Sequence, residues 1–379
     1  MSWLIGGRQG EAKKLIALLS DSLKRDNAAR DLIKLGGDAV PLLMEALQTQ
    51  DPGLLLIYQQ ILSRIPSAST ALTKSLATAH PVIRARAAET LGIGRDKASL
   101  PALLDALNSE FILVRSRAAI ALGSIGDVQA VPGLLLLLKD REDEARSAAC
   151  HALGMFRDPF TFDELANVLL DDPKIEVRQS AATALGDTKH PAAIPFLMEA
   201  LRDSFWWFER EQAIAVLLTA IEKMGTAVVE PLIHALGDRE ATVRRFAAIV
   251  LGGLRDPRAM EELAMLQYDL HHEVGKAAAD ALAKFGAQAV DILIESLGHP
   301  EPGIRKNGVI ALGNIQDARV APVLIEMLGD PDREIQKQAL HSLGQINDRG
   351  ALSALQEVAA NRADRELAAL AKKILDFGA

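Results

Sequence analysis

Nine leucines recur in one repeated pattern, and this repeat limits the possible folds more than any other feature. Each copy of the pattern is numbered from a marked position, which is usually an arginine. Each leucine lies seven residues after its mark, mostly small residues lie three and four places after it, and a glycine follows the leucine in most copies. Successive marks are 30 to 34 residues apart, a spacing typical of helical repeats. The marks are Arg84, Arg115, Arg146, Arg178, Arg210, Arg244, Gly275, Arg305 and Gln336, and the leucines are Leu91, Leu122, Leu153, Leu185, Leu217, Leu251, Leu282, Leu312 and Leu343.

Each period predicts two helices joined by a turn. The first helix begins at a proline in five units and has a leucine six residues later, as in Pro101 and Leu107. The second helix carries the leucine, and we expect the glycine after it to be a left-handed C-terminal cap. One unit cannot bury its own apolar stripe, so units must stack on one another. The sequence therefore predicts an all-α fold, an α-solenoid of about twelve two-helix repeats.

The pattern of the second helix resembles HEAT repeats, specifically the short HEAT-like type named after phycobilisome (PBS) lyases, whose second helix reads VRxxAAxALG. The resemblance is strong over residues 80–345 and weaker on either side. We expect a single solenoid over residues 1–379, with regular repeats at 38–345. More polar terminal repeats at 1–37 and 346–379 would cap its ends.

Composition excludes several classes of protein. The net charge is −8 and the pI about 5.6, which argues against nucleic acid as a partner, because nucleic-acid-binding domains are usually basic. The longest apolar run, near Val131–Leu138, is too short to cross a membrane. The lone cysteine, Cys150, lies at a core position and excludes disulfides within the chain. A cytoplasmic protein without a membrane anchor is the expectation.

The repeated arginines suggest either an anion-binding groove or an internal ladder. Helix geometry places the marked position on the side that also carries the buried residues, which favours the ladder. We expect the partners to be the aspartates four residues after the glycine, which can also cap the next helix. These are Asp96, Asp127, Asp158, Asp256, Asp317 and Asp348.

The outward face of the second helices is the candidate binding surface, because in HEAT-like arrays these helices line the concave side. One basic residue follows the mark in each of four successive repeats, which predicts a stripe for an acidic partner. An alternative is a solvated face in which Glu273 and Glu334 pair with the lysines three residues later. The predicted residues are Arg245, Lys276, Lys306 and Lys337, the apolar Phe246, Ile249 and Ile310 beside them, and Arg86 and Arg117 in earlier repeats.

Two other clusters stand out. Phe205, Trp206, Trp207 and Phe208 are adjacent, so they either seal an irregular seventh repeat or form an exposed hydrophobic site for a partner or ring-shaped ligand. His271-His272-Glu273 is the densest histidine site. HEAT-like deoxyhypusine hydroxylases hold two irons with several His-Glu pairs, whereas this sequence offers one, so no metal site is predicted.

No catalytic signature accompanies the repeats. The favoured function is a non-enzymatic scaffold whose concave face binds a protein, as an extended acidic or amphipathic segment, without a cofactor. The alternative, implied by the resemblance, is a bilin lyase-like enzyme or a chaperone for a tetrapyrrole chromophore, which would use the aromatic cluster and nearby arginines. A HEAT-like DNA glycosylase is disfavoured by the acidic pI.

Overall fold

The computed structural model describes residues 2–206, 211–346 and 348–377. Over these residues it contains 24 α-helices and no strand, which confirms the all-α solenoid. Trp207 and Phe208 of the predicted aromatic cluster lie outside the described residues. The chain divides into two compact units: unit 1 comprises residues 1–200 and 205–220, and unit 2 comprises residues 201–204 and 221–379.

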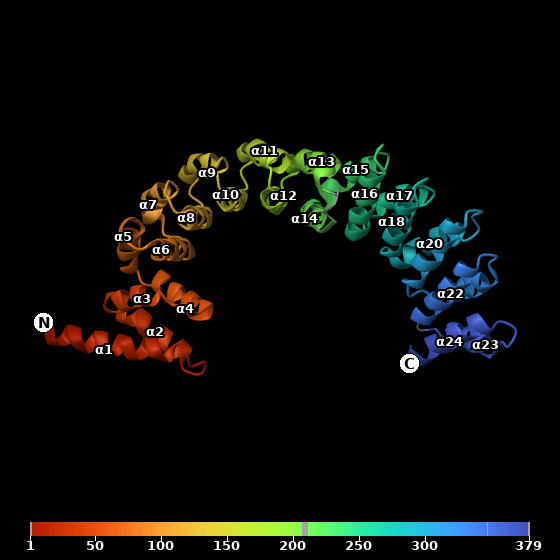
Figure 1. Cartoon of the computed structure of the whole chain (residues 1–379), viewed down its shortest axis with the longest axis horizontal. Helices are drawn as coiled ribbons and strands as arrows, with labels where there is room; N and C mark the ends of the chain where they lie inside the picture. The colour runs from red at the N-terminus through yellow and green to blue at the C-terminus, as the bar shows by residue number, and fades with distance from the viewer. Residues whose placement is uncertain (1, 207–210, 347, 378–379) are drawn as a thin grey trace. The chain divides into compact units, whose positions relative to one another are not determined.

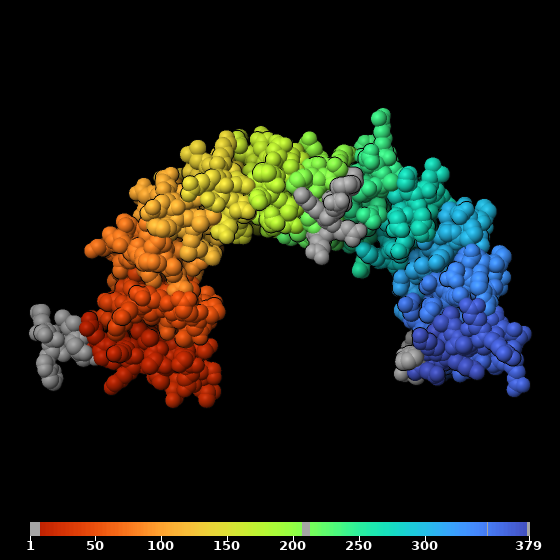
Figure 2. Space-filling model, viewed as in Figure 1, coloured from red at the N-terminus to blue at the C-terminus, as the bar shows by residue number. Residues whose placement is uncertain are grey.

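Unit 1 is built from helix pairs in which an odd-numbered first helix precedes an even-numbered second helix. Its helices are α1 (Ser2–Leu18), α2 (Arg25–Leu35), α3 (Val40–Ala46), α4 (Pro52–Ser63), α5 (Ala68–Thr78), α6 (Pro81–Ile93), α7 (Leu100–Ala106), α8 (Ile112–Ile125), α9 (Val131–Leu137), α10 (Asp143–Phe156), α11 (Phe162–Asp171), α12 (Ile175–Thr188), and most of α13 (Ile194–Arg202) and α14 (Glu211–Glu222). Within this unit α6, α8, α10 and α12 line the inner side and α5, α7, α9 and α11 the outer side (Figure 1). The space-filling view shows a continuous surface over these helices (Figure 2).

Unit 2 repeats the same pairing. Its helices are α15 (Val229–Ala235), α16 (Ala241–Leu254), α17 (Met260–Leu266), α18 (His272–Ala283), α19 (Val290–Ser296), α20 (Pro302–Gly313), α21 (Val320–Glu326), α22 (Arg333–Gln345), α23 (Arg349–Ala360) and α24 (Arg365–Phe377). Short 3₁₀ helices precede or follow many first helices in both units: η1 (Gly36–Asp38), η2 (Lys97–Ser99), η3 (Val128–Ala130), η4 (Pro159–Thr161), η5 (Pro191–Ala193), η6 (Ser204–Trp206), η7 (Gly225–Val228), η8 (Pro257–Ala259), η9 (Gly286–Ala289) and η10 (Met327–Gly329).

The repeated leucines form the core between layers, as predicted. All nine are at most 1% exposed. The small residues before them are buried too, as Ala118 and Ala119 show at 0% exposure. Burying one leucine side chain contributes roughly 2 kcal/mol, so the stack is held together mainly by this aliphatic seam.

The glycine that follows most of these leucines is not the helix cap that the sequence led us to expect. Gly92, Gly123 and Gly154 lie inside their helices, against the next second helix. A β-carbon on Gly123 would lie 2.7 Å from Cα of Ala152, and one on Gly154 would lie 2.8 Å from Cβ of Ala184. The glycine is therefore needed for close approach between helices.

The left-handed residues that follow the second helices lie three positions further along. Arg95, Arg157, Lys189 and Arg255 have φ angles of 48° to 53°, and Gly126 has a φ of 71°. Gly286 takes the same position after α18, with a φ of 63°, so four of these six left-handed positions carry a basic side chain instead of glycine.

The arginine ladder exists, but its predicted aspartate partners are wrong. Arg115 Nε lies 2.8 Å from Asp140, and Arg305 Nε lies 2.8 Å from Asp330. Each aspartate follows the first helix of the next repeat, about 25 residues on; the same contact joins Arg146 to Asp172 and Arg244 to Asp269. The predicted aspartates cap the next helix instead: Asp127, for example, accepts a hydrogen bond from the backbone N–H of Gln129 at 3.1 Å.

These arginines also donate to carbonyls of their own repeat. Arg115 Nη1 lies 2.9 Å from the Ser109 oxygen, and Arg305 Nη1 lies 2.9 Å from the His299 oxygen. With 7% and 11% of their side chains exposed, they are not available to a ligand. The hydrogen bond from Arg305 holds the pKa of Asp330 below its usual value.

Candidate functional site

The basic stripe predicted on unit 2 lies on successive second helices, α16, α18, α20 and α22. Lys337 is already paired, with Nζ 2.7 Å from Glu366 and 3.0 Å from Glu334. The Arg245 guanidinium lies over the ring of Phe246, 4.7 Å from its centroid. Lys276 and Lys306 have no ion pair with any residue that the structure describes, so the expected Glu273–Lys276 pair is absent among those residues. Two of the four cations therefore remain open to a partner.

The apolar residues predicted beside this stripe differ in exposure. Ile249 is 37% exposed and Ile310 is half-buried. Phe246 is only 4% exposed, so the prediction that it lies on an open surface is wrong. Its ring packs beneath the guanidinium of Arg245.

The two arginines predicted on the same face of unit 1 are held by neighbouring groups. Arg86 Nη1 donates to the carbonyl of Thr49 at 2.9 Å and also to that of Leu47. Arg117 Nε lies 2.9 Å from Glu89. Both side chains link adjacent repeats, which limits their use in binding.

The described part of the aromatic cluster faces the protein interior. Trp206 is 0% exposed, so its ring is closed to a ligand. Phe205 is half-buried, and the guanidinium carbon of Arg178 lies 3.7 Å from the centroid of its ring. These two residues fit the interpretation that the cluster seals an irregular repeat.

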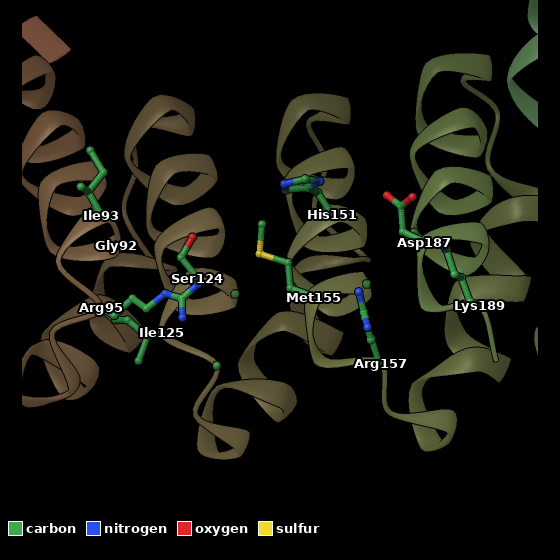
Figure 3. A pocket seen from close by; sticks show the side chains of 14 residues that line it. Gly92, Ile93, Arg95, Ser124, Ile125, His151, Met155, Arg157, Asp187 and Lys189 are labelled. Carbon is green, nitrogen blue, oxygen red and sulfur yellow. The ribbon is translucent and has the colours of Figure 1, made fainter. Parts of the chain in front are cut away.

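A hollow of unit 1 crosses the C-terminal ends of α6, α8, α10 and α12. We call it the C-end groove; its volume is about 830 Å³. It lies on the second-helix face that the sequence predicted, and Figure 3 shows the side chains from these helices that line it. The lining residues are Gly92, Ile93, Arg95, Gly123, Ser124, Ile125, Gly126, His151, Gly154, Met155, Arg157, Ala184, Asp187 and Lys189.

Glycines and basic residues line the groove. Gly92, Gly123 and Gly154, the glycines of the helix contacts, line it. Arg95, Arg157 and Lys189, whose side chains are exposed, line it at left-handed positions (Figure 3). None of the three side chains has a hydrogen bond or ion pair with the residues that the structure describes.

The stability of the helices does not explain why these three left-handed positions carry basic residues. A left-handed backbone costs a residue other than glycine about 1–2 kcal/mol, whereas a cation near a helix C-terminus returns only about 0.3–1 kcal/mol. Gly126 occupies the equivalent position after α8, so the repeat accepts glycine there. The excess cost points to a role for the side chains at the surface.

Apolar and polar side chains lie between the cations. Ile93 is 44% and Met155 42% exposed, and both line the groove with the exposed His151 and Asp187. Sequence reasoning placed these positions on the outward face but missed the basic residue three places after the glycine. The recurring pattern Leu-Gly-x-x-Arg/Lys, as at Leu153–Arg157, was the available signal.

Neither a metal centre nor a membrane segment is found in the described ranges. No group of three or more histidine, cysteine, aspartate or glutamate side chains there could hold a metal ion. His271 Nδ1 lies 3.3 Å from Asp269, the ladder partner of Arg244. None of the described helices combines the length and apolar character needed to cross a bilayer.

Two units of stacked helix pairs define an α-solenoid. The chain belongs to the HEAT-repeat family: the HEAT-repeat model matches residues 69–144, 131–218, 228–311 and 290–375. The model of the PBS lyase HEAT-like repeat matches residues 24–49. These matches confirm the resemblance seen in the sequence. No curated protein matches the chain.

Solved structures of karyopherins share the fold. Kap121p bound to Pho4p is 14% identical with a TM-score of 0.58, over 98% of this chain and 50% of that one. Kap95p, in a structure with RanGDP, is 13% identical with a TM-score of 0.55, over 96% of this chain and 59% of that one. The CpcE–CpcF phycocyanin lyase of Nostoc sp. PCC7120 is 23% identical over 59% of this chain and 92% of that one, with a TM-score of 0.36. The chain thus spans about half the length of the karyopherins it matches, and the likeness shows the fold alone.

Proposed function

We propose that this protein is a non-enzymatic scaffold that binds a partner protein on its second-helix face, chiefly in the C-end groove. The observation that carries the proposal is a set of three cations, Arg95, Arg157 and Lys189, that have no partner among the described residues and are held along the groove at a cost in backbone energy. Exposed Ile93 and Met155 beside them give the mixed apolar and charged character of protein interfaces. The karyopherin Kap121p, which has the same fold, is bound to Pho4p in its crystal structure.

The basic stripe of unit 2 is a second proposed contact. The ammonium groups of Lys276 and Lys306 have no ion pair with a described residue, and Ile249 is exposed on the neighbouring helix α16. Because Lys337 is already paired with Glu334 and Glu366, we expect its charge reversal to weaken partner binding less than reversal of Lys276 and Lys306. A larger effect at Lys337 would remove the stripe as a contact.

Site-specific photo-crosslinking in the source cells tests the proposal. A benzophenone amino acid replaces Met155 in the groove or, as a control, Leu136, which is 75% exposed on the first helix α9. We expect a discrete adduct from position 155 that is missing at position 136. Adducts of equal yield at both positions would contradict a specific site.

Charge reversal connects the adduct to the groove. The variant Arg95→Glu/Arg157→Glu/Lys189→Glu should lose the adduct. A matched variant with the same charge change, Lys74→Glu/Lys97→Glu/Lys139→Glu, alters exposed lysines outside the groove and should keep it. If both variants keep the adduct, the cations do not carry the binding.

The same variants distinguish a tetrapyrrole ligand from a protein partner. A bilin carries propionate groups that the groove cations could bind. A saturable red shift in bilin absorption that the groove reversal abolishes, without any protein adduct at position 155, would replace the protein partner by a chromophore.

A further inference from the structure

We infer that the C-end groove binds an acidic protein segment of about ten residues in an extended conformation, lying across α6, α8, α10 and α12. This inference rests on the proposed function and specifies the chemistry and conformation of the partner. Its evidence is the length of the groove and the spacing of its charges.

The length of the groove suits a short extended chain. Packed helices are about 8–10 Å apart, so the groove extends about 24–30 Å from α6 to α12. An extended chain, which advances about 3.3 Å per residue, covers that length with about seven to nine residues. A helix, which advances about 1.5 Å per residue, would need about 16–20 residues.

The charges select an acidic segment with a defined spacing. Carbonyls at helix ends repel carboxylates, so acidic side chains must be placed by Arg95 on α6, Arg157 on α10 and Lys189 on α12. Gly126 leaves α8 without a cation. Arg95 and Arg157 are two helix spacings apart, which corresponds to about six residues of an extended chain. Arg157 and Lys189 are one helix spacing apart, which corresponds to about three residues. We therefore expect acidic residues at positions 1, 7 and 10 of the segment.

Fluorescence anisotropy with the full-length protein and labelled peptides tests this inference. The first probe is the decamer Glu-Ser-Pro-Gly-Ser-Pro-Glu-Ser-Pro-Glu, whose prolines prevent a helix. The second has the same composition with its glutamates adjacent. The third is a twenty-residue alanine-based helix with three glutamates on one face over the same length.

We expect the spaced decamer to bind more tightly than either other probe. Three exposed ion pairs at about 0.5 kcal/mol each amount to about tenfold in affinity. The variant Arg95→Ala/Arg157→Ala/Lys189→Ala should lose that factor, Lys74→Ala/Lys97→Ala/Lys139→Ala should not, and added salt should weaken binding.

Failure of the inference is distinguishable from failure of the proposed function. Tighter binding of the helical probe would overturn the extended conformation. Equal binding of the two decamers would overturn the spacing, and binding unaffected by the cations would overturn the acidic chemistry. In each case a groove-dependent crosslink at position 155 would leave the scaffold function standing.

Discussion

Units 1 and 2 share one repeat but use the cations after their second helices differently. In unit 1, Arg95, Arg157 and Lys189 face the C-end groove without partners among the described residues. In unit 2, Arg258 and Arg319 lie three residues beyond the equivalent positions and bind the preceding repeat. Arg255 is the exception in unit 2, since it keeps the left-handed position.

The two arginines of unit 2 make the same clamp. Arg319 contacts Asp317 and Asp291, each at 2.9 Å, and the carbonyl of Ala287 at 2.7 Å. Arg258 contacts Asp256, Glu230 and the carbonyl of Thr226 in the same way. Where unit 2 has these arginines, unit 1 has Ala98, Gln129, Phe160 and Ala192. One loop position therefore ties repeats together, and another, three residues earlier, leaves charge available to a ligand.

The largest expected effect concerns the arginine–aspartate ladder, which the two units share. Replacing Asp172 in unit 1 or Asp330 in unit 2 with alanine leaves a buried arginine without its carboxylate, which costs about 3–5 kcal/mol of stability. Hydrogen exchange should increase in α10 and α12 for Asp172→Ala and in α20 and α22 for Asp330→Ala, because each repeat contacts only its neighbours.

The double variant Arg305→Met/Asp330→Leu is the control, since it removes both charges and should regain most of the lost protection. If only one unit responds to loss of its aspartate, the ladder is not a common framework.

The glycine contacts come next in size. Gly154→Val in unit 1 and Gly252→Val in unit 2 place side-chain atoms where a β-carbon already lies within 2.9 Å of the facing alanine. We expect each to reduce the free energy of unfolding by about 1–3 kcal/mol, measured by urea denaturation. Gly10→Val, in α1 with open space around it, should not destabilise the protein. A neutral result at Gly154 would show that close approach is not required.

Much of this framework was predictable from the sequence because it repeats. Leucine seven residues after each mark has one explanation, an inward stripe, and Leu122 and Leu282 are fully buried. The role of the glycines was misassigned, because a glycine near a helix end fits both a cap and a close contact. The next residues decide between them: Arg95, Arg157 and Lys189 take the left-handed position themselves.

The ladder partners and the groove depend on neighbouring repeats, which the spacing within one repeat does not reveal. Asp140 and Asp330 lie about 25 residues beyond their arginines, further along the chain than the nearby capping aspartates. Phe246 was predicted to be exposed from its position on the helix alone, but its ring is covered by Arg245. Sequence therefore predicted which face of the second helices points outward better than it predicted which side chains on that face are exposed.

Low pH should weaken the arginine–aspartate ladder in both units. The loss of stability should be smaller than the loss caused by replacing the aspartates, because protonation is partial. Arg305 lowers the pKa of Asp330. For Asp140, burial raises the pKa, but the hydrogen bonds from Arg115 and the Glu142 N–H outweigh it, so the net shift is also downward. Such carboxylates stabilise the fold above their unfolded pKa of about 3.9 and lose that contribution as the pH falls further.

Hydrogen exchange at pH 5 and at pH 3 tests this dependence. We expect less protection at pH 3 around α8 and α20, after correction for intrinsic rates, and a smaller change around α20 in the Asp330→Asn variant. Protection that rises on acidification would mean that the carboxylates are protonated in the folded protein.

The smallest expected effects divide the two units most clearly. Arg157→Gly places the residue favoured in a left-handed backbone after α10, so stability should change by less than about 1 kcal/mol. Arg319→Ala removes a clamp in unit 2 and should lower the urea midpoint slightly, because the arginine is partly exposed. Binding of the spaced acidic decamer should show the opposite order. The Arg157→Gly variant should bind the decamer more weakly, and the Arg319→Ala variant should bind it with unchanged affinity. If Arg157→Gly destabilises the fold more than Arg319→Ala does, the cations of the groove are structural, and the contrast between the units disappears.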